Sequence, residues 1–220
     1  MSGLFYFEII FHVFPLFVFF YYKNILKFDK NNFLIVGLIF SSFLADLIGL
    51  WLANSGIDTN LVSTLYIIAE RIISVLIVIS FSSISLKIKK LLLTTVTIIS
   101  IYQIVSSIIN GCLIYNDYIN FISGVILCLF SLHTLFTLIS QTIADSSEID
   151  IRIWPVIALF FFMSATLIPD MITNIDDSME FPIFFQYVRI GVTIGSNIIR
   201  DCLFAFFFFQ VKKMNYVTGK

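Results

Sequence analysis

The sequence predicts an all-α membrane protein with seven transmembrane helices. The mean hydropathy of the 220 residues is +1.01, and only 12% of them carry a charged side chain. In soluble domains about a quarter of the residues are charged. The apolar residues also fall into seven runs, each near the roughly 20 residues that a helix needs to cross a bilayer. We therefore expect a single seven-helix domain over residues 1–220, surrounded by the lipid bilayer.

Each predicted span is an apolar run bounded by polar or turn-forming residues. The runs are 4–22, 33–53, 61–84, 91–115, 121–143, 153–172 and 182–210. The connections between them are short and contain turn residues, for example Asn54, Ser55 and Gly56. The first run contains Glu8 and His12 and has no basic segment before it, so we expect a retained helix rather than a cleaved signal peptide.

The lysines predict the orientation of the chain. All nine lie in segments on one side of a seven-span arrangement: Lys23, Lys27, Lys30, Lys87, Lys89, Lys90, Lys212, Lys213 and Lys220. Loops on the other side carry acids such as Asp58 and Asp117. Because loops rich in Lys and Arg stay in the cytoplasm, we expect the N-terminus outside and the C-terminus inside. The expected location is the cell membrane, as a multi-pass protein of the bacterial inner membrane. The formal net charge of -1 favours no nucleic-acid partner.

Ionisable side chains inside the predicted spans mark the candidate site. A charged group in hydrocarbon is costly, so such residues pair with one another or line a wet cavity, and are functional candidates. Most of them map to the outer half of the membrane, and Glu8 and His12 share one helix face because they are four residues apart. We predict one outward-facing pocket lined by Glu8, His12, Asp46, Glu70, Arg71, His133, Gln186 and Arg189.

A purely structural role is the alternative for these charges. Arg189 could pair with Glu70, or Arg71 with Asp46, and each pair would lock two helices together. Arg200 and Asp201 lie deeper, and we expect them to form a separate structural ion pair or the inner end of a relay.

Neither a metal nor a cofactor is expected. The chain has two histidines, His12 and His133, without the spacing of a metal-binding motif. A site built from both histidines and the outer-half carboxylates is a minor alternative. A retinal protein is excluded because no lysine lies within a span.

Small residues at every fourth position predict close packing between helices of the chain. Gly191 and Gly195 form a GxxxG motif in the last span, and Ala45 and Gly49 continue such a stripe in the second. Small residues at this spacing let helix backbones approach one another in lipid.

Two stretches resemble uncharacterised small seven-span membrane proteins of bacteria. They are FLADLIGLWLANSGIDTNLVSTLYIIAERI and IRIWPVIALFFFMSATLIPDMI, and their matching positions are Asp46, Asn60, Glu70, Trp154 and Ser164. This resemblance implies a fold and no activity. GLIFSSFLAD and FFFMSATL are in turn similar to the lysoplasmalogenase-like membrane hydrolases, although Ala165 stands where that pattern has an Asp.

The leading functional hypothesis is a receptor-like or sensory module with an outward-facing polar pocket for a small-molecule or lipid ligand. Its loops are short, so output would pass to a cytoplasmic signalling partner. One alternative is a membrane-embedded hydrolase for a lipid-like substrate, with Asp46, Glu70 and His133 as acid–base groups. A small-solute or proton-coupled transporter is the third hypothesis, suggested by polar residues from Arg189 to Arg200.

Overall fold

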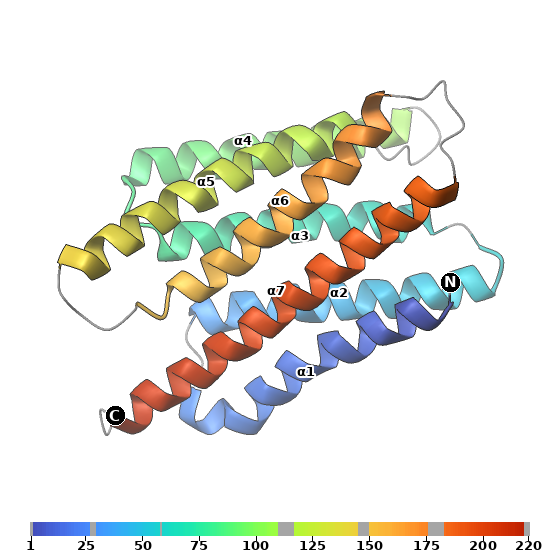
Figure 1. Ribbon diagram of the computed structural model, residues 1–220. Coiled ribbons are helices and arrows are strands. Elements are labelled where there is room, and N and C mark those ends of the chain that lie inside the picture. The colour runs from blue at the N-terminus through green and yellow to red at the C-terminus, as the bar shows by residue number, and fades with distance from the viewer. Residues whose placement is uncertain are drawn as a thin grey trace.

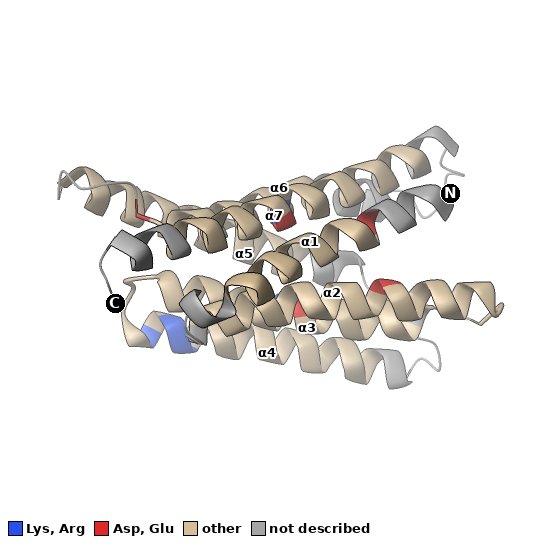
Figure 2. Cartoon of the chain, turned by 90° about the horizontal axis from the view of Figure 1, so that it is seen from below, with Lys and Arg blue, Asp and Glu red and all other residues tan. Residues whose placement is uncertain are grey.

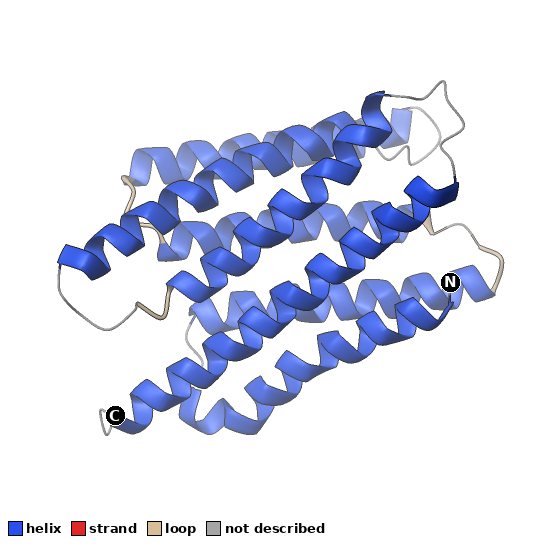
Figure 3. Cartoon of the chain, in the orientation of Figure 1, coloured by secondary structure: helices blue, strands red, loops and turns tan. Residues whose placement is uncertain are grey.

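The computed structural model describes residues 2–26, 30–57, 59–109, 117–144, 150–175 and 183–217. Side chains near several helix ends, including those of Gln186 and Arg189, fall outside the described set. All regular structure in the described ranges is helical (Figure 3). The helices are α1 (Ser2–Leu26), α2 (Lys30–Asn54), α3 (Asn60–Phe81), α4 (Leu86–Ile109), α5 (Asp117–Ala144), α6 (Ile153–Ile175) and α7 (Ile183–Val217).

The predicted all-α class is confirmed, and each predicted run falls on one helix. By length and composition, α2, α3, α4, α5 and α7 can cross a membrane, which is typical of a multi-pass membrane protein. The described apolar stretches of α1 and α6, Glu8–Tyr22 and Ile153–Leu167, are shorter. The third run was predicted to reach residue 84, but α3 ends at Phe81. Ser82 is extended, and its hydroxyl accepts a hydrogen bond from the amide of Ile84 in place of a helical bond.

Five helices form a closed ring, and this ring positions the candidate site. Helix α1 packs against α2 and α7, α2 against α3, α3 against α6, and α6 against α7. Helices α4 and α5 pack against α3 outside this ring, with α5 also against α6. Successive helices run in opposite directions along the bundle (Figure 1). The inward faces of α1, α2, α3, α6 and α7 therefore surround one shared space.

Lysines lie at one end of the bundle. Figure 2 shows the lysines at the start of α4 at the same end as the C-terminus, and the N-terminus at the opposite end. The residues concerned are Lys87, Lys89 and Lys90. Three of the nine lysines that the sequence analysis assigns to one side of the membrane therefore lie at the end of the bundle that carries the C-terminus.

An apolar core fills the half of the ring that includes the C-terminal part of α7. Phe19 of α1 and Phe208 of α7 lie with ring centroids 5.3 Å apart, and both are buried. Ile35, Leu38 and Leu159 bring α2 and α6 into the same cluster. In contrast, Phe20 is 55% exposed although it follows Phe19 directly. Large exposed apolar side chains on the outer surface are expected where lipid replaces water.

The glycine with close side-chain contacts from other helices is not one of the predicted ones. A Cβ atom added to Gly49, Gly191 or Gly195 would meet no atom within 4 Å, so these glycines do not bring two helices of this chain together. At Gly124 of α5 the added atom would lie 2.9 Å from Nη1 of Arg71 and 3.0 Å from Leu167. Gly124 thus makes room for the Arg71 side chain, which the spacing of small residues does not reveal.

Replacement of Phe19 by Ala is expected to lower the free energy of unfolding by about 3 kcal/mol, because the cavity left between α1 and α7 stays unfilled. The neighbouring change, Phe20→Ala, is the matched control and should alter it by no more than about 0.5 kcal/mol. Unfolding by sodium dodecyl sulfate in bicelles, followed by circular dichroism, measures both. Equal losses in the two variants would contradict the assignment of the buried face of α1.

Candidate functional site

Four helices of the ring each place two polar side chains on their inward face, one turn apart. Residues four positions apart lie on the same face of a helix. The pairs are Glu8 and His12 on α1, Ser42 and Asp46 on α2, Tyr66 and Glu70 on α3, and Asn197 and Asp201 on α7, with Arg200 beside the last. Because neighbouring helices are antiparallel, these pairs form two layers within the ring.

Arg200 lies at the centre of the inner layer and has no exposed surface. Its Nη1 donates a hydrogen bond to Glu70 at 2.8 Å, and its Nε donates one to Asp201 at 3.2 Å. Its Nη2 donates to the hydroxyl of Ser42 at 3.2 Å. The guanidinium also lies 4.6 Å from the ring centroid of Phe162, a cation–π contact. Arg200 therefore joins α7 to α2, α3 and α6.

His12 connects the two layers through both of its ring nitrogens. Nδ1 forms a short contact with a carboxylate oxygen of Asp201, and Nε2 lies 3.0 Å from a carboxylate oxygen of Asp46. The imidazole is buried, whereas the side chain of Asp46 is 25% exposed. His12 thus links α1 to α7 on one side and to α2 on the other.

Neutral polar groups complete the network. The Tyr66 hydroxyl donates to Glu70 at 2.5 Å and lies 2.8 Å from the hydroxyl of Ser42. The amide nitrogen of Asn197 donates to Glu8 at 2.5 Å. Buried polar groups are stable only when they are hydrogen-bonded, and these bonds supply most of the partners that the charged groups require.

A cavity of about 440 Å³ borders this network. Its polar lining includes Glu8, Asp46, Glu70, Arg71 and Asn197. Its apolar lining includes Val62, Ile67, Ile190, Ile194 and Phe162. The lining residues come from α1, α2, α3, α6 and α7, which are the helices of the ring. The cavity therefore occupies the space that the ring encloses.

Arg71 lines this cavity without an ion pair among the described residues. The side chain is buried, and its Nη1 contacts the sulfur of Met163 at 3.5 Å, a weak hydrogen bond. Its Nε is buried and has no hydrogen-bond partner in the described part of the chain. A buried guanidinium normally has a carboxylate or another strong acceptor beside it.

The structure brings together most of the predicted site residues but pairs them differently. Glu8, Asp46, Glu70 and Arg71 line one cavity, and His12 lies directly behind it. The possible pairing of Arg71 with Asp46 is not found, because Asp46 contacts His12 instead. Glu70 is paired with Arg200. Arg200 and Asp201 form the expected ion pair, but they are part of the central network rather than a separate one.

His133 does not belong to this site. It is an exposed residue of α5, a helix outside the ring, and its Nδ1 lies 3.5 Å from the hydroxyl of Thr137 on the same helix. The predicted acid–base set of Asp46, Glu70 and His133 is therefore not assembled. The side chains of Gln186 and Arg189 lie outside the described residues, so their predicted place in the pocket stays a prediction.

Sequence reasoning missed Ser42 and Asn197 as members of the network. Both are neutral residues within apolar runs, and neutral polar residues in such runs are commonly satisfied within their own helix. Their spacing was the available signal, because Ser42 lies four residues before Asp46 and Asn197 four before Asp201. The metal alternative named both histidines, whereas the grouping in the structure joins His12 with Glu8 and Asp46 and leaves His133 out: one donor atom from each of the three lies within 4.8 Å of the others.

Comparisons of the chain with protein-family models, with curated proteins and with solved structures find no match. The function is therefore inferred from the arrangement of the site. It combines a partly open cavity, a buried network of ion pairs behind it and one guanidinium on its wall without a charged partner among the described residues.

Removal of the Arg200 guanidinium, by Arg200→Gln, is expected to lower the free energy of unfolding by about 3–5 kcal/mol, because two carboxylates stay buried without their cation. The exposed pair of Arg152 and Asp150 provides the control: Arg152→Gln should cost no more than about 1 kcal/mol. Unfolding in mixed micelles gives both values. If the double variant Glu70→Gln/Arg200→Gln is no more stable than Arg200→Gln alone, the ion pair is not the origin of the loss.

Proposed function

We propose that the chain crosses a cell membrane seven times, with its N-terminus outside and its C-terminus in the cytoplasm. The alternating directions of the helices and the seven apolar runs support seven crossings. The gathering of Lys87, Lys89 and Lys90 at the C-terminal end of the bundle supports this orientation, since basic segments stay in the cytoplasm. A bacterial inner membrane is the simplest location for such a chain.

Single cysteines in the two exposed loops test the orientation. In a background without Cys112, Cys128 and Cys202, Ser55→Cys should react with a membrane-impermeant maleimide in intact spheroplasts, and Ser83→Cys only in inverted vesicles. Both positions are exposed in the structure, so accessibility within the fold is matched. Labelling of both cysteines from the same side would contradict the proposed topology.

We further propose that the protein is receptor-like and binds a small molecule with an acidic group in the cavity within the ring. The single observation that carries this proposal is Arg71, a buried guanidinium on the cavity wall with no ion pair among the described residues. An acidic group of a ligand would supply the bidentate partner that a guanidinium prefers. Ionisable groups within membrane helices commonly mark such binding sites.

The size and lining of the cavity favour an amphipathic ligand. About 440 Å³ lies within the range typical of small-molecule sites. Apolar side chains such as Val62, Ile67 and Ile190 line it together with the polar groups. A single-chain molecule with a phosphate or carboxylate head would place the head at Arg71 and the chain against these residues.

A ligand in this cavity would touch all five helices of the ring at once. It could therefore change their packing, provided that it binds one arrangement more tightly than another. The loops leave little room for a signalling domain, so a cytoplasmic partner would receive the change through the lysine-rich segment and the C-terminal tail. This mode of output distinguishes the receptor-like proposal from hydrolysis or transport.

The proposed site can be tested with decyl phosphate, compared with decanol as a neutral probe of equal chain length. Decyl phosphate should raise the melting temperature of the protein in nanodiscs, because a ligand that binds only the folded state stabilises it by mass action. Decanol should raise it much less, since it offers no charge to Arg71. Arg71→Gln should abolish the difference between the probes.

Two further variants control for indirect effects on this measurement. His133→Gln alters an exposed residue outside the ring and should leave the response unchanged. Gly124→Ala introduces a Cβ atom against the tip of Arg71, so it should weaken the response to decyl phosphate while the protein stays folded. An undiminished response in Arg71→Gln would refute the proposed binding mode.

A further inference from the structure

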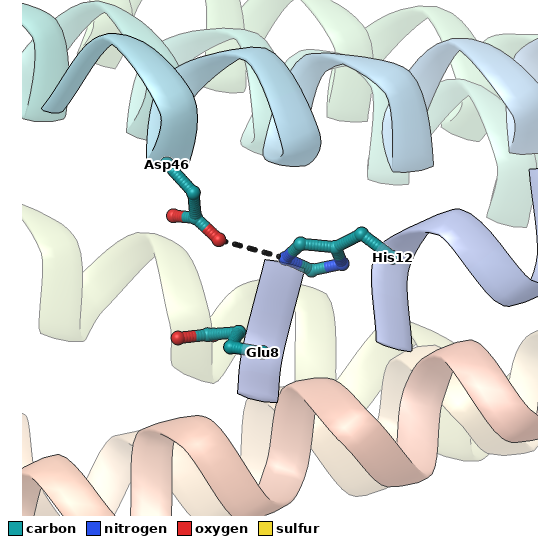
Figure 4. A group of neighbouring side chains, drawn as sticks. All are labelled: Glu8, His12 and Asp46. Atoms are coloured by element: carbon teal, nitrogen blue, oxygen red, sulfur yellow. Dashed lines mark hydrogen bonds and ion pairs between the residues drawn. The ribbon is translucent and has the colours of Figure 1, made fainter. Parts of the chain in front are cut away.

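We propose that Glu8, His12 and Asp46 bind a divalent transition-metal ion at the edge of the cavity. Figure 4 shows the carboxyl groups of Glu8 and Asp46 on the side of the His12 ring that carries Nε2. One carboxylate oxygen from each acid and a nitrogen of His12 lie within 4.8 Å of one another. This metal site is distinct from the acidic-group site at Arg71 and goes beyond the proposed ligand binding.

The distances are close to those of a metal site. Two ligand atoms bound to one ion at about 2.1 Å, at angles between octahedral and tetrahedral values, lie roughly 3.0–3.4 Å apart. His12 Nε2 and the Asp46 oxygen are 3.0 Å apart, which fits this requirement. All three atoms lie within 4.8 Å of one another, against the roughly 4.2 Å that separates two opposite ligands of one ion, so at most a small side-chain shift would complete the site.

The hydrogen-bond contacts of His12 also favour a metal ion at this position. Both ring nitrogens face carboxylate oxygens, but a neutral imidazole carries only one N–H. With the proton on Nδ1 and donated to Asp201, Nε2 and Asp46 face each other as two acceptors and require a cation between them. A metal ion there would displace the proton that otherwise bridges the two atoms. The bond from Nδ1 to a carboxylate is also the usual second-shell contact of a metal-binding histidine.

The network also has a surplus of carboxyl groups. Asp46, Glu70 and Asp201 contact one guanidinium, that of Arg200, or one imidazole, that of His12, and Glu8 lies close to Asp46 and His12. Four carboxylates against one fixed cation are costly in a buried site. A divalent cation at Glu8 and Asp46 would bring the network close to neutrality.

Asn197 provides an independent observation at the same place. It is buried and lines the cavity, and its Oδ1 has no hydrogen-bond partner among the described residues. Its amide nitrogen is already used by Glu8, so the oxygen is available to the ion or to a water molecule bound to it. Asp46 and Glu8 both border the cavity, which gives the ion access and open coordination positions.

The ligand set indicates the class of ion. One imidazole and two carboxylates suit Zn²⁺, Mn²⁺, Fe²⁺ or Co²⁺, since thiolates would be needed to select softer ions. The proposed ligands are Nε2 of His12 and one oxygen each of Glu8 and Asp46. Asp201 is a positioning residue, which holds the imidazole through Nδ1.

The test uses the full-length protein in detergent, stripped of metal by chelation and titrated with Co²⁺. Wild type should show a saturable visible absorption band at about one equivalent, because Co²⁺ reports its ligand geometry and Zn²⁺ should displace it. Asp46→Asn and Glu8→Gln keep the side-chain shape and should each weaken Co²⁺ binding by at least about tenfold. Asp201→Asn should weaken it by about 10–100-fold, as expected for a second-shell partner of a ligating histidine.

Matched controls separate this site from adventitious binding and from misfolding. His133→Gln removes the other histidine, which is exposed, and should leave the titration unchanged. Each variant must elute as the wild type does in size exclusion, and Glu8→Gln serves as the ligand variant if Asp46→Asn fails to fold. Wild-type affinity in correctly folded Glu8→Gln and Asp46→Asn would overturn the proposal, as would stabilisation by butylammonium without any by Co²⁺ or Zn²⁺. The response to decyl phosphate is measured separately. A negative result in the metal titration therefore does not contradict the proposed acidic-group site at Arg71.

Discussion

The arrangement of the helices depends on one buried guanidinium. Arg200 has no exposed surface and reaches Glu70 on α3, Asp201 on its own helix and Ser42 on α2. A desolvated guanidinium is tolerated only when its donors are matched by well-placed acceptors. Rotation of α2, α3 or α7 about its axis would leave at least one of these groups unpaired. The rotational positions of three helices are therefore fixed together, and the ring that they form with α1 and α6 follows from them.

His12 extends this constraint to α1 and thereby determines where the cavity can lie. The imidazole holds Asp201 at one nitrogen and Asp46 at the other, so α1 cannot shift along its axis without breaking both contacts. One helical turn from His12 and Asp201, in the other layer, lie Glu8 on α1 and Asn197 on α7. They are hydrogen-bonded to each other and line the cavity. Buried polar groups are therefore present on α1 and α7 in both layers, and not only in the layer that contains Arg200. Glu8 and Asn197 thereby contribute polar groups to a cavity that Val62, Ile67 and Ile190 also line.

Apolar run length and lysine placement were sufficient to predict seven helices and the grouping of Glu8, Asp46, Glu70 and Arg71. Depth and helix face follow from residue spacing, but the rotation of one helix against another does not. The alternative pairing of Arg71 with Asp46 is therefore not found, and the pairing of Glu70 with Arg200 was not foreseen. Arg200 and Asp201 are adjacent, and consecutive residues point about 100° apart around a helix. Arg200 therefore reaches Glu70, whereas Asp201 reaches His12. Their adjacency in the sequence predicts that they pair with each other but not that they have these other partners. His133 was misplaced because sequence cannot show that α5 lies outside the ring.

The two arginines near the cavity show why charge pairing separates structure from function. Arg200 and Arg71 are both buried, and both occur in membrane-type helices where a free charge is costly. Arg200 has two carboxylates, a hydroxyl and an aromatic ring around it, so its role in stability accounts for its presence. Arg71 has a thioether and an unpartnered Nε among the described residues, and a glycine on α5 makes room for its tip. A buried guanidinium without a strong acceptor is costly, and the described part of the chain supplies none. This difference is the reason why we propose Arg71, and not Arg200, as the group that binds an acidic ligand.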